Sequence, residues 1–260
     1  VKDLEASFAF YVETLGLQVT EKESNYIYLR GMEERGHHSV ILKKSEKPTC
    51  NVLGYKVFDE EQLYKAENYF NSKNIKTKWI ERPFQGKTLL THDIHGIPIE
   101  FYYQMDRLPT IHQKYKLYNG VKPLRIDHFN VFSINVDESV KFYSDLGFRV
   151  TEYTEDEKSK KLWAAWMHRK GTVHDIAFTN GVGPRLHHVA FWVPTPMNII
   201  DLLDVMSTTG YITNIERGPG RHGISNAFFL YIRDPDGHRT EIYCSDYQTC
   251  LLYTSDAADD

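Results

Sequence analysis

The chain has 260 residues, of which 41% are hydrophobic and 25% charged, and a formal net charge of -4. This composition is ordinary for a globular protein with one large or two medium domains. The charge balance and the lack of a Lys/Arg-rich tract argue against nucleic acid and anionic membranes as partners, and no apolar run approaches the length of a bilayer span. The three cysteines are scattered and form no CxxC pair, which favours a reducing cytoplasm over a disulfide framework or a zinc ribbon.

Both ends of the chain look artificial. Val1 stands directly before a helical pattern, without a preceding methionine, so we expect that an opening strand has been cut away. Residues 250–260 resemble a translated adapter from a sequencing library. We therefore predict that residues 250–260 are a non-native tail with no part in the fold or the function.

The first half starts with a short amphipathic helix at 3–16, which ends in a glycine suited to the left-handed C-terminal cap. Short alternating strands follow, for example at 26–30, and a second helix is predicted near 60–71. At 93–102 an Asp and a Gly supply turn chemistry, and the alternation after them predicts a strand with Glu100 on one face.

The second half opens after a stretch at 106–123 in which strand periodicity lapses, so we expect a linker there. The strand predicted at 124–131 alternates cleanly and places His128 on one face. A helix follows at 137–147, again ending in Gly, and another strand is predicted at 163–167.

The rest of the second half follows the same plan. A strand is predicted at 185–193, a helix at 197–206 and a strand at 227–232. The turn and strand at 234–243 carry Glu241 at the spacing at which the first half carries Glu100.

This internal repeat predicts the architecture. We expect an α+β fold of four βαβββ modules, paired into two similar halves with mixed sheets that curl around central cavities. The predicted division is an N-terminal metal-free domain at 1–110, with a truncated first strand, and a C-terminal metal-binding catalytic domain at 120–247.

A metal site is plausible in the second half only. Two imidazoles, His128 and His188, and the carboxylate of Glu241 come from three separate strands and would form a 2-His-1-carboxylate face with open positions on the metal. A single strand histidine is more often a hydrogen-bonded core residue, so each ligand is weak evidence alone. In the first half Val52 stands at the place of His188, and we expect Glu100 to be structural.

Residues 124–247 resemble the type I extradiol dioxygenases of the vicinal-oxygen-chelate (glyoxalase/bleomycin resistance) superfamily, and the first half resembles the family's N-terminal domain less specifically. The segments that carry the resemblance are Leu124-Arg-Ile-Asp-His-Phe-Asn130, Ala164-Ala-Trp-Met-His-Arg-Lys-Gly-Thr-Val-His-Asp175, Pro184-Arg-Leu-His-His-Val-Ala-Phe191, Glu216-Arg-Gly-Pro-Gly-Arg-His-Gly223 and Asp234-Pro-Asp-Gly-His-Arg-Thr-Glu-Ile-Tyr243. Together they favour the ligand interpretation of the two histidines and the glutamate.

The resemblance also implies roles around the metal. His174 would be the acid/base residue beside the O2 site, a task for which a pKa near neutrality suits histidine. Asn130 and Tyr231 would hydrogen-bond at the oxygen and substrate sites. The alternative for His174 is an ordinary loop histidine, and for Tyr231 a tyrosine at the rim of the core.

The substrate contacts that the resemblance implies lie largely in a Gly/Pro-rich loop. Arg217 would grip a side-chain carboxylate, His222 would contact a catechol oxygen, and Trp166 would line the carboxylate end of the pocket. The alternative for Arg217 is a solvated loop charge.

The implied reaction is extradiol cleavage of a catechol by O2 at Fe(II), with Mn(II) as the other candidate metal. Within the family the resemblance is greatest to enzymes of aromatic compound catabolism that convert 3,4-dihydroxyphenylacetate to 5-carboxymethyl-2-hydroxymuconate semialdehyde. The resemblance also implies a homotetramer. A glyoxalase-like isomerase or transferase, and a metal-free small-molecule binding protein, remain alternatives on the same fold.

Overall fold

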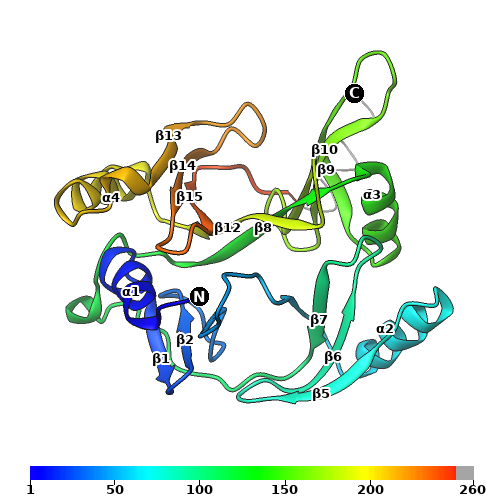
Figure 1. Ribbon diagram of the computed structural model, residues 1–260, viewed down its shortest axis with the longest axis horizontal. Helices are drawn as coiled ribbons and strands as arrows, with labels where there is room; N and C mark the ends of the chain where they lie inside the picture. The colour runs from blue at the N-terminus through cyan, green and yellow to red at the C-terminus, as the bar shows by residue number, and fades with distance from the viewer. Residues whose placement is uncertain (250–260) are drawn as a thin grey trace.

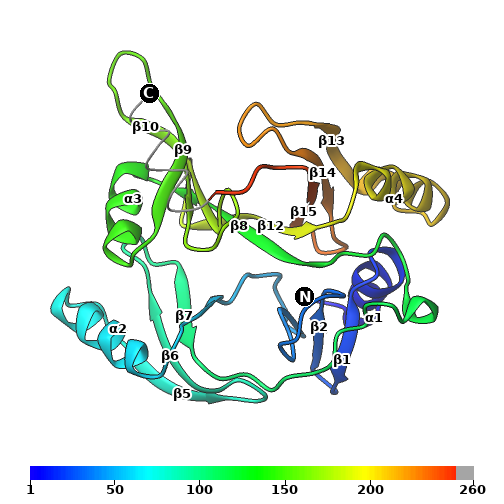
Figure 2. The ribbon, with the colours of Figure 1, turned by 180° about the vertical axis from the view of Figure 1, so that it is seen from behind.

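The computed structural model describes residues 1–249; the tail predicted at 250–260 lies outside the described residues. The strands form a three-stranded, a four-stranded and an eight-stranded sheet, and the longer helices lie on the outside of the molecule (Figures 1 and 2). No helix within residues 1–249 is long and apolar enough to cross a membrane.

The first half contributes the two smaller sheets. Its elements are α1 (Leu4–Phe8), the π-helical turn η1 (Ala9–Thr14), β1 (Gln18–Lys22), β2 (Tyr26–Arg30), β3 (Val40–Lys43), β4 (Leu53–Lys56), α2 (Glu61–Ser72), β5 (Lys78–Arg82), β6 (Gly86–His92) and β7 (Pro98–Tyr102). The stretch predicted as a linker contains one 3-10 turn, η2 (Tyr115–Leu117).

The second half forms the eight-stranded sheet. Its elements are β8 (Arg125–Ser133), α3 (Val136–Asp145), β9 (Arg149–Glu155), β10 (Leu162–His168), β11 (Ile176–Asn180), β12 (Arg185–Trp192), α4 (Pro196–Thr208), the 3-10 turn η3 (Ile212–Asn214), β13 (Ile215–Arg221), β14 (Phe228–Arg233) and β15 (Arg239–Cys244). The sheet is mixed, because β8 runs parallel to β11 and β12 runs parallel to β15 while their other pairings are antiparallel. These sheets confirm the predicted α+β class.

Local chemistry explains where the repeated elements begin and end. The side chain of Asp3 caps the first helix, and Gly16, at φ +92°, ends that helical stretch in the left-handed region. In the predicted turns, Asp93 accepts from the backbone N–H groups of residues 95 and 97, and Asp234 accepts from those of residues 236 and 238. The two turns are thus the same structure in both halves, and each delivers the following strand in the same register.

The strand order shows the duplication and one gap in it. The second half has the order β9-β10-β11-β8-β12-β15-β14-β13. The first half has β1-β2-β3 in one sheet and β4-β7-β6-β5 in the other, which is the same order with no described strand at the place of β8. A cavity of about 1390 Å³ lies here, lined by β3, β4 and the start of β8.

Each of the two large hydrophobic cores joins one half of the chain to the other. In the first core, Phe10 and Leu15 from the start of the chain pack with Leu202 on α4 and Leu230 on β14. In the second core, residues of α2 and β7 pack with α3, β10 and β11; its fully buried aromatic side chains are Phe70, Tyr143 and Phe178. Because side chains of this size contribute about 2–3 kcal/mol each on burial, the halves support each other's folding.

Candidate metal centre

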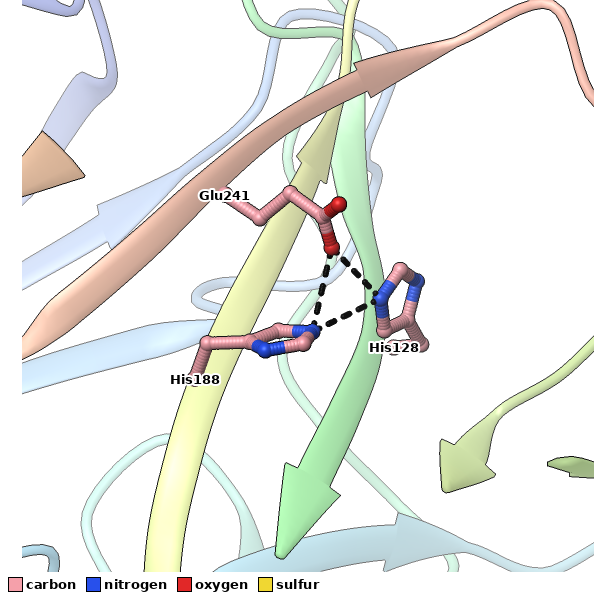
Figure 3. A group of neighbouring side chains, drawn as sticks. All are labelled: His128, His188 and Glu241. Carbon is pink, nitrogen blue, oxygen red and sulfur yellow. Dashed lines mark hydrogen bonds and ion pairs between the residues drawn. The ribbon is translucent and has the colours of Figure 1, made fainter. Parts of the chain in front are cut away.

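Three side chains converge from three neighbouring strands of the eight-stranded sheet (Figure 3). His128 lies on β8, His188 on β12 and Glu241 on β15, and each is at most 2% exposed. The Nε2 atoms of the two histidines are 3.1 Å apart, and they lie 2.9 and 3.0 Å from the same carboxylate oxygen, Oε2 of Glu241. The structure therefore brings together the three residues that the sequence predicts as ligands.

The spacing of these atoms suits a metal ion. Three ligand atoms that each bind a metal at about 2.1 Å, at right angles to one another, are about 3 Å apart, which matches the edges of this triangle. Two imidazole nitrogens and one carboxylate oxygen on one face form the ligand set typical of non-haem Fe(II) oxygenases, and both Fe(II) and Mn(II) accept such ligands. The residues present thus fit a divalent metal.

Electrostatics within the triad favour a cation. The buried carboxyl of Glu241 has its pKa held well below the usual range; burial alone would raise it, but His188, His128 and His222 together outweigh burial. Burial lowers the pKa of His188 to about 4, so this imidazole is neutral at pH 7. For His128 burial acts in the same direction, but Asp127 and Glu241 outweigh it and raise its pKa to about 9. A metal cation that binds here takes the place of that proton.

Two supporting residues were missed in the sequence. Asp127 accepts a 2.8 Å hydrogen bond from Nδ1 of His128, and Nδ1 of His187 lies 2.6 Å from Nδ1 of His188. Each immediately precedes the histidine that it contacts. Because ligand histidines usually bond a second polar group through their other ring nitrogen, the pairs Asp-His and His-His were the signal that could have identified them.

The ring of His174 lies against that of His128, with centroids 3.8 Å apart. The side chain is 3% exposed and its Nδ1 atom is buried without a hydrogen-bond partner among the described residues. Burial, and then the neighbouring His128, hold the pKa of His174 well below its ordinary value. This histidine is therefore neutral at pH 7, with a pKa below the near-neutral value expected from the sequence, and its Nδ1 atom is available for a hydrogen bond beside the triad.

His222 and Tyr231 border the other side of the carboxylate. Nε2 of His222 lies 2.9 Å from Oε1 of Glu241, and its ring stacks on Phe229 with centroids 3.8 Å apart. The hydroxyl of Tyr231 lies 3.4 Å from the same nitrogen, and its ring is 5.2 Å from that of His188. Burial raises the pKa of Tyr231 well above its ordinary value, so the hydroxyl keeps its proton and can donate it in a hydrogen bond.

The remaining predicted residues lie further from the triad. The amide oxygen of Asn130 accepts from the hydroxyl of Thr179 at 3.1 Å, and its backbone faces that of His188 across the β8–β12 pair. Arg217 is exposed on β13 opposite Tyr231. Trp166 is half-buried on β10, and no hydrogen bond or ring contact within residues 1–249 joins it to the triad.

The large cavity between the halves is a separate feature. It touches Asp127 and His128 along β8, but its lining includes neither His188 nor Glu241. We therefore do not place the substrate there.

Comparison with known proteins decides the family. Residues 125–242 match the Glyoxalase/Bleomycin resistance protein/Dioxygenase superfamily. The chain is 30% identical over 254 residues to a metapyrocatechase of Geobacillus stearothermophilus, covering 92% of this chain and 76% of that one. It is also 30% identical over 261 residues to a manganese-dependent 2,3-dihydroxybiphenyl 1,2-dioxygenase of Geobacillus genomosp. 3, covering 94% of this chain and 82% of that one.

Solved structures agree with these relatives. A homoprotocatechuate 2,3-dioxygenase of Brevibacterium fuscum, in complex with 3,4-dihydroxyphenylacetate, matches with a TM-score of 0.93 and 44% identity over 95% of this chain and 78% of that chain. The enzyme of the same name from Arthrobacter globiformis matches with a TM-score of 0.93 and 43% identity over the same shares. The chain belongs to the extradiol ring-cleaving dioxygenases.

This membership confirms the predicted enzyme class over the isomerase and the metal-free binding protein. The dioxygenase cleaves catechols with O2 and uses a divalent metal, Fe(II) or Mn(II).

Proposed function

We propose that this dioxygenase cleaves 3,4-dihydroxyphenylacetate to 5-carboxymethyl-2-hydroxymuconate semialdehyde at Fe(II), or Mn(II), held by His128, His188 and Glu241. The observation that carries the proposal is the 2.9–3.1 Å triangle of two imidazole nitrogens and one carboxylate oxygen. A metal bound there supplies Lewis acidity and electron transfer between the catecholate and O2. The residues around it bind, orient and exchange protons.

His174 exchanges protons with the substrate and oxygen. Because burial keeps it neutral at pH 7, it can accept a proton without first losing one, and its partnerless Nδ1 atom has no competing hydrogen bond within residues 1–249. On the opposite side, His222 and the protonated hydroxyl of Tyr231 orient a catechol oxygen, and Asn130 lines the site beside His188.

Arg217 selects for a substrate carboxylate. It lies on β13 across from Tyr231, where a guanidinium can grip a carboxylate through two hydrogen bonds. In this proposal Trp166 on β10 lines the carboxylate end of the substrate site. A substituent with a carboxylate on the catechol ring fits this arrangement, which supports 3,4-dihydroxyphenylacetate over an uncharged catechol.

The two parts of the chain divide the work. Residues 120–247 are the catalytic, metal-binding domain, and residues 1–110 are a metal-free domain that packs against it through the two shared cores. The protein works as a homo-oligomer, and the family resemblance favours a tetramer. Its location is the cytoplasm, because free cysteines such as Cys50 and Cys244 suit a reducing compartment. Light scattering on the purified protein measures the assembly.

The decisive experiment measures O2 uptake by protein loaded with Fe(II) without air, on addition of 3,4-dihydroxyphenylacetate or 4-methylcatechol, which lacks the carboxylate. We expect uptake and a yellow ring-opened product, with the higher kcat/KM for the acid.

His188→Ala should abolish both activities, whereas Val52→Ala, at the equivalent place in the first half, should keep them. Arg217→Met should raise the KM for the acid and leave that for 4-methylcatechol unchanged. Uptake that survives His188→Ala would overturn the ligand assignment, and a KM for the acid unchanged from the wild type in Arg217→Met would overturn the role of Arg217.

A further inference from the structure

The two imidazoles of the triad are supported by different groups. Behind His128 lies the carboxylate of Asp127, whose Oδ2 is 2.8 Å from Nδ1. Behind His188 lies the neutral ring of His187, and behind that the guanidinium of Arg239, whose Nη1 is 2.6 Å from Nε2 of His187. On the side away from Glu241, one ligand therefore contacts a carboxylate, whereas the other contacts a neutral ring that accepts from Arg239, a cation paired with Glu216.

The carboxylate of Asp127 is committed to His128. Its side chain is 1% exposed, and Oδ1 is buried with no hydrogen-bond partner among residues 1–249. The nearby ammonium of Lys170 binds the backbone carbonyl of Asp127, at 2.6 Å, and the carboxylate of Asp175, at 3.0 Å, instead. Burying a carboxylate costs several kcal/mol unless it is paired. Within residues 1–249 the imidazole of His128 is the one hydrogen-bond partner of this side chain.

The direction of that hydrogen bond sets the tautomer of His128. A carboxylate accepts this bond, so Nδ1 keeps its hydrogen, and once a metal replaces the other proton the lone pair is on Nε2, the atom that faces His188 and Glu241. The negative charge also makes Nε2 a stronger donor to a metal.

We propose that Asp127 is a positioning residue of the dioxygenase: it holds His128 as the Nδ1–H tautomer and makes it the more electron-donating of the two histidine ligands. The inference rests on the proposed metal site. It assigns the two histidines unequal shares in holding the metal and in tuning its redox potential, although both occupy similar places in the sheet.

The test compares Mn(II) binding to the metal-free wild type, Asp127→Asn, Asp127→Ala and Asp175→Asn, with free Mn(II) followed by electron paramagnetic resonance. Asp175→Asn is the matched control, because it removes a carboxylate beside the same Lys170 without touching a ligand histidine. We expect about 10- to 100-fold weaker binding in Asp127→Ala, a smaller loss in Asp127→Asn, which can still accept the hydrogen bond, and nearly unchanged binding in Asp175→Asn. Circular dichroism checks that each variant is folded, and Asp127→Asn decides the matter if the alanine variant does not fold.

A second readout is the Fe(III)/Fe(II) potential of the loaded proteins. Loss of the negative charge should raise it in Asp127→Asn and leave it unchanged in Asp175→Asn, a split that a purely structural role would not produce. Wild-type affinity and potential in both Asp127 variants would overturn this inference alone. A wild type that binds no Mn(II) would overturn it together with the proposed metal site.

Discussion

Glu100 and Glu241 stand at equivalent places in the two halves and are both buried, yet they have different partners. The register is the same: Glu100 faces Gly54 across β4 and β7, and Glu241 faces Ala190 across β12 and β15. Glu241 meets His188 and His128. Glu100 instead meets the guanidinium of Arg82, and the amide of Gln85 donates to its other oxygen at 2.9 Å.

The difference shows two ways to stabilise the same buried carboxylate. A carboxylate inside a protein requires a cation or several hydrogen-bond donors. In the first half the cation is the side chain of Arg82, whose Nη2 lies 2.7 Å from Oε2 of Glu100. In the second half the cation is exchangeable: it is the proton on His128, or a metal that takes its place between the two imidazoles. The duplicated strand is therefore structural in one half and suited to metal chemistry in the other.

The largest expected effect comes from removing the charge of each glutamate. Glu241→Gln should lower kcat at least about 100-fold and weaken metal binding, because the triad of His128, His188 and Glu241 loses its carboxylate. Glu100→Gln should leave both nearly unchanged and alter only stability. Metal analysis and O2 uptake measure the contrast; comparable losses of activity in the two variants would show that the halves are not divided in this way.

Arg82→Met should destabilise the protein by about 2–4 kcal/mol, because it leaves Glu100 buried without its cation. The side chain of Arg82 is 32% exposed, so solvent relieves part of the cost. Urea unfolding measures the effect. The double variant Arg82→Met/Glu100→Gln should recover most of the loss, whereas a double variant as unstable as the single one would refute the pairing.

Acid should weaken the first half through His38. Burial, and then His37, lower its folded pKa to about 4 from an ordinary value near 6.5. Below pH 6.5 His38 therefore binds a proton in the unfolded chain but stays neutral in the folded protein. The free energy of unfolding falls as the pH falls from 6.5 towards 4. Between pH 7.5 and 5 this loss is on the order of 2 kcal/mol. Urea unfolding of the metal-free protein should show a flatter pH dependence in His38→Gln, with the exposed His112→Gln as control; parallel curves for wild type and His38→Gln would contradict it.

The smallest expected effect is that of Val52→His. It restores a histidine at the place of His188, but the described first half has no strand at the place of β8 and hence no equivalent of His128. We expect the metal content to stay at that of the wild type, measured by elemental analysis after Mn(II) loading. A second metal bound per chain would show that one histidine and Glu100 suffice.

Much of the fold and the site could be predicted from the sequence, because the caps, turns and strand patterns depend on residues close together in the chain. The helix that ends at Gly16 and the Asp93 and Asp234 turns depend on residues at most about a dozen positions apart. The three residues of the triad could be predicted as ligands because the repeat aligns Glu241 with Glu100, and because several motifs match one family. The supporting contacts of Asp127 and His187 were missed, since adjacency in sequence does not show where a side chain points.

By itself, then, the sequence determined the module plan, the caps and turns, and which half could hold a metal. Only the tertiary structure decided how distant segments meet. It brought His128 within 2.9 Å of Glu241 across 113 residues, paired Arg82 with Glu100, and built each core from both halves. The physical reason is that periodicity specifies which face of an element is apolar, whereas its packing partner depends on the arrangement of the whole chain.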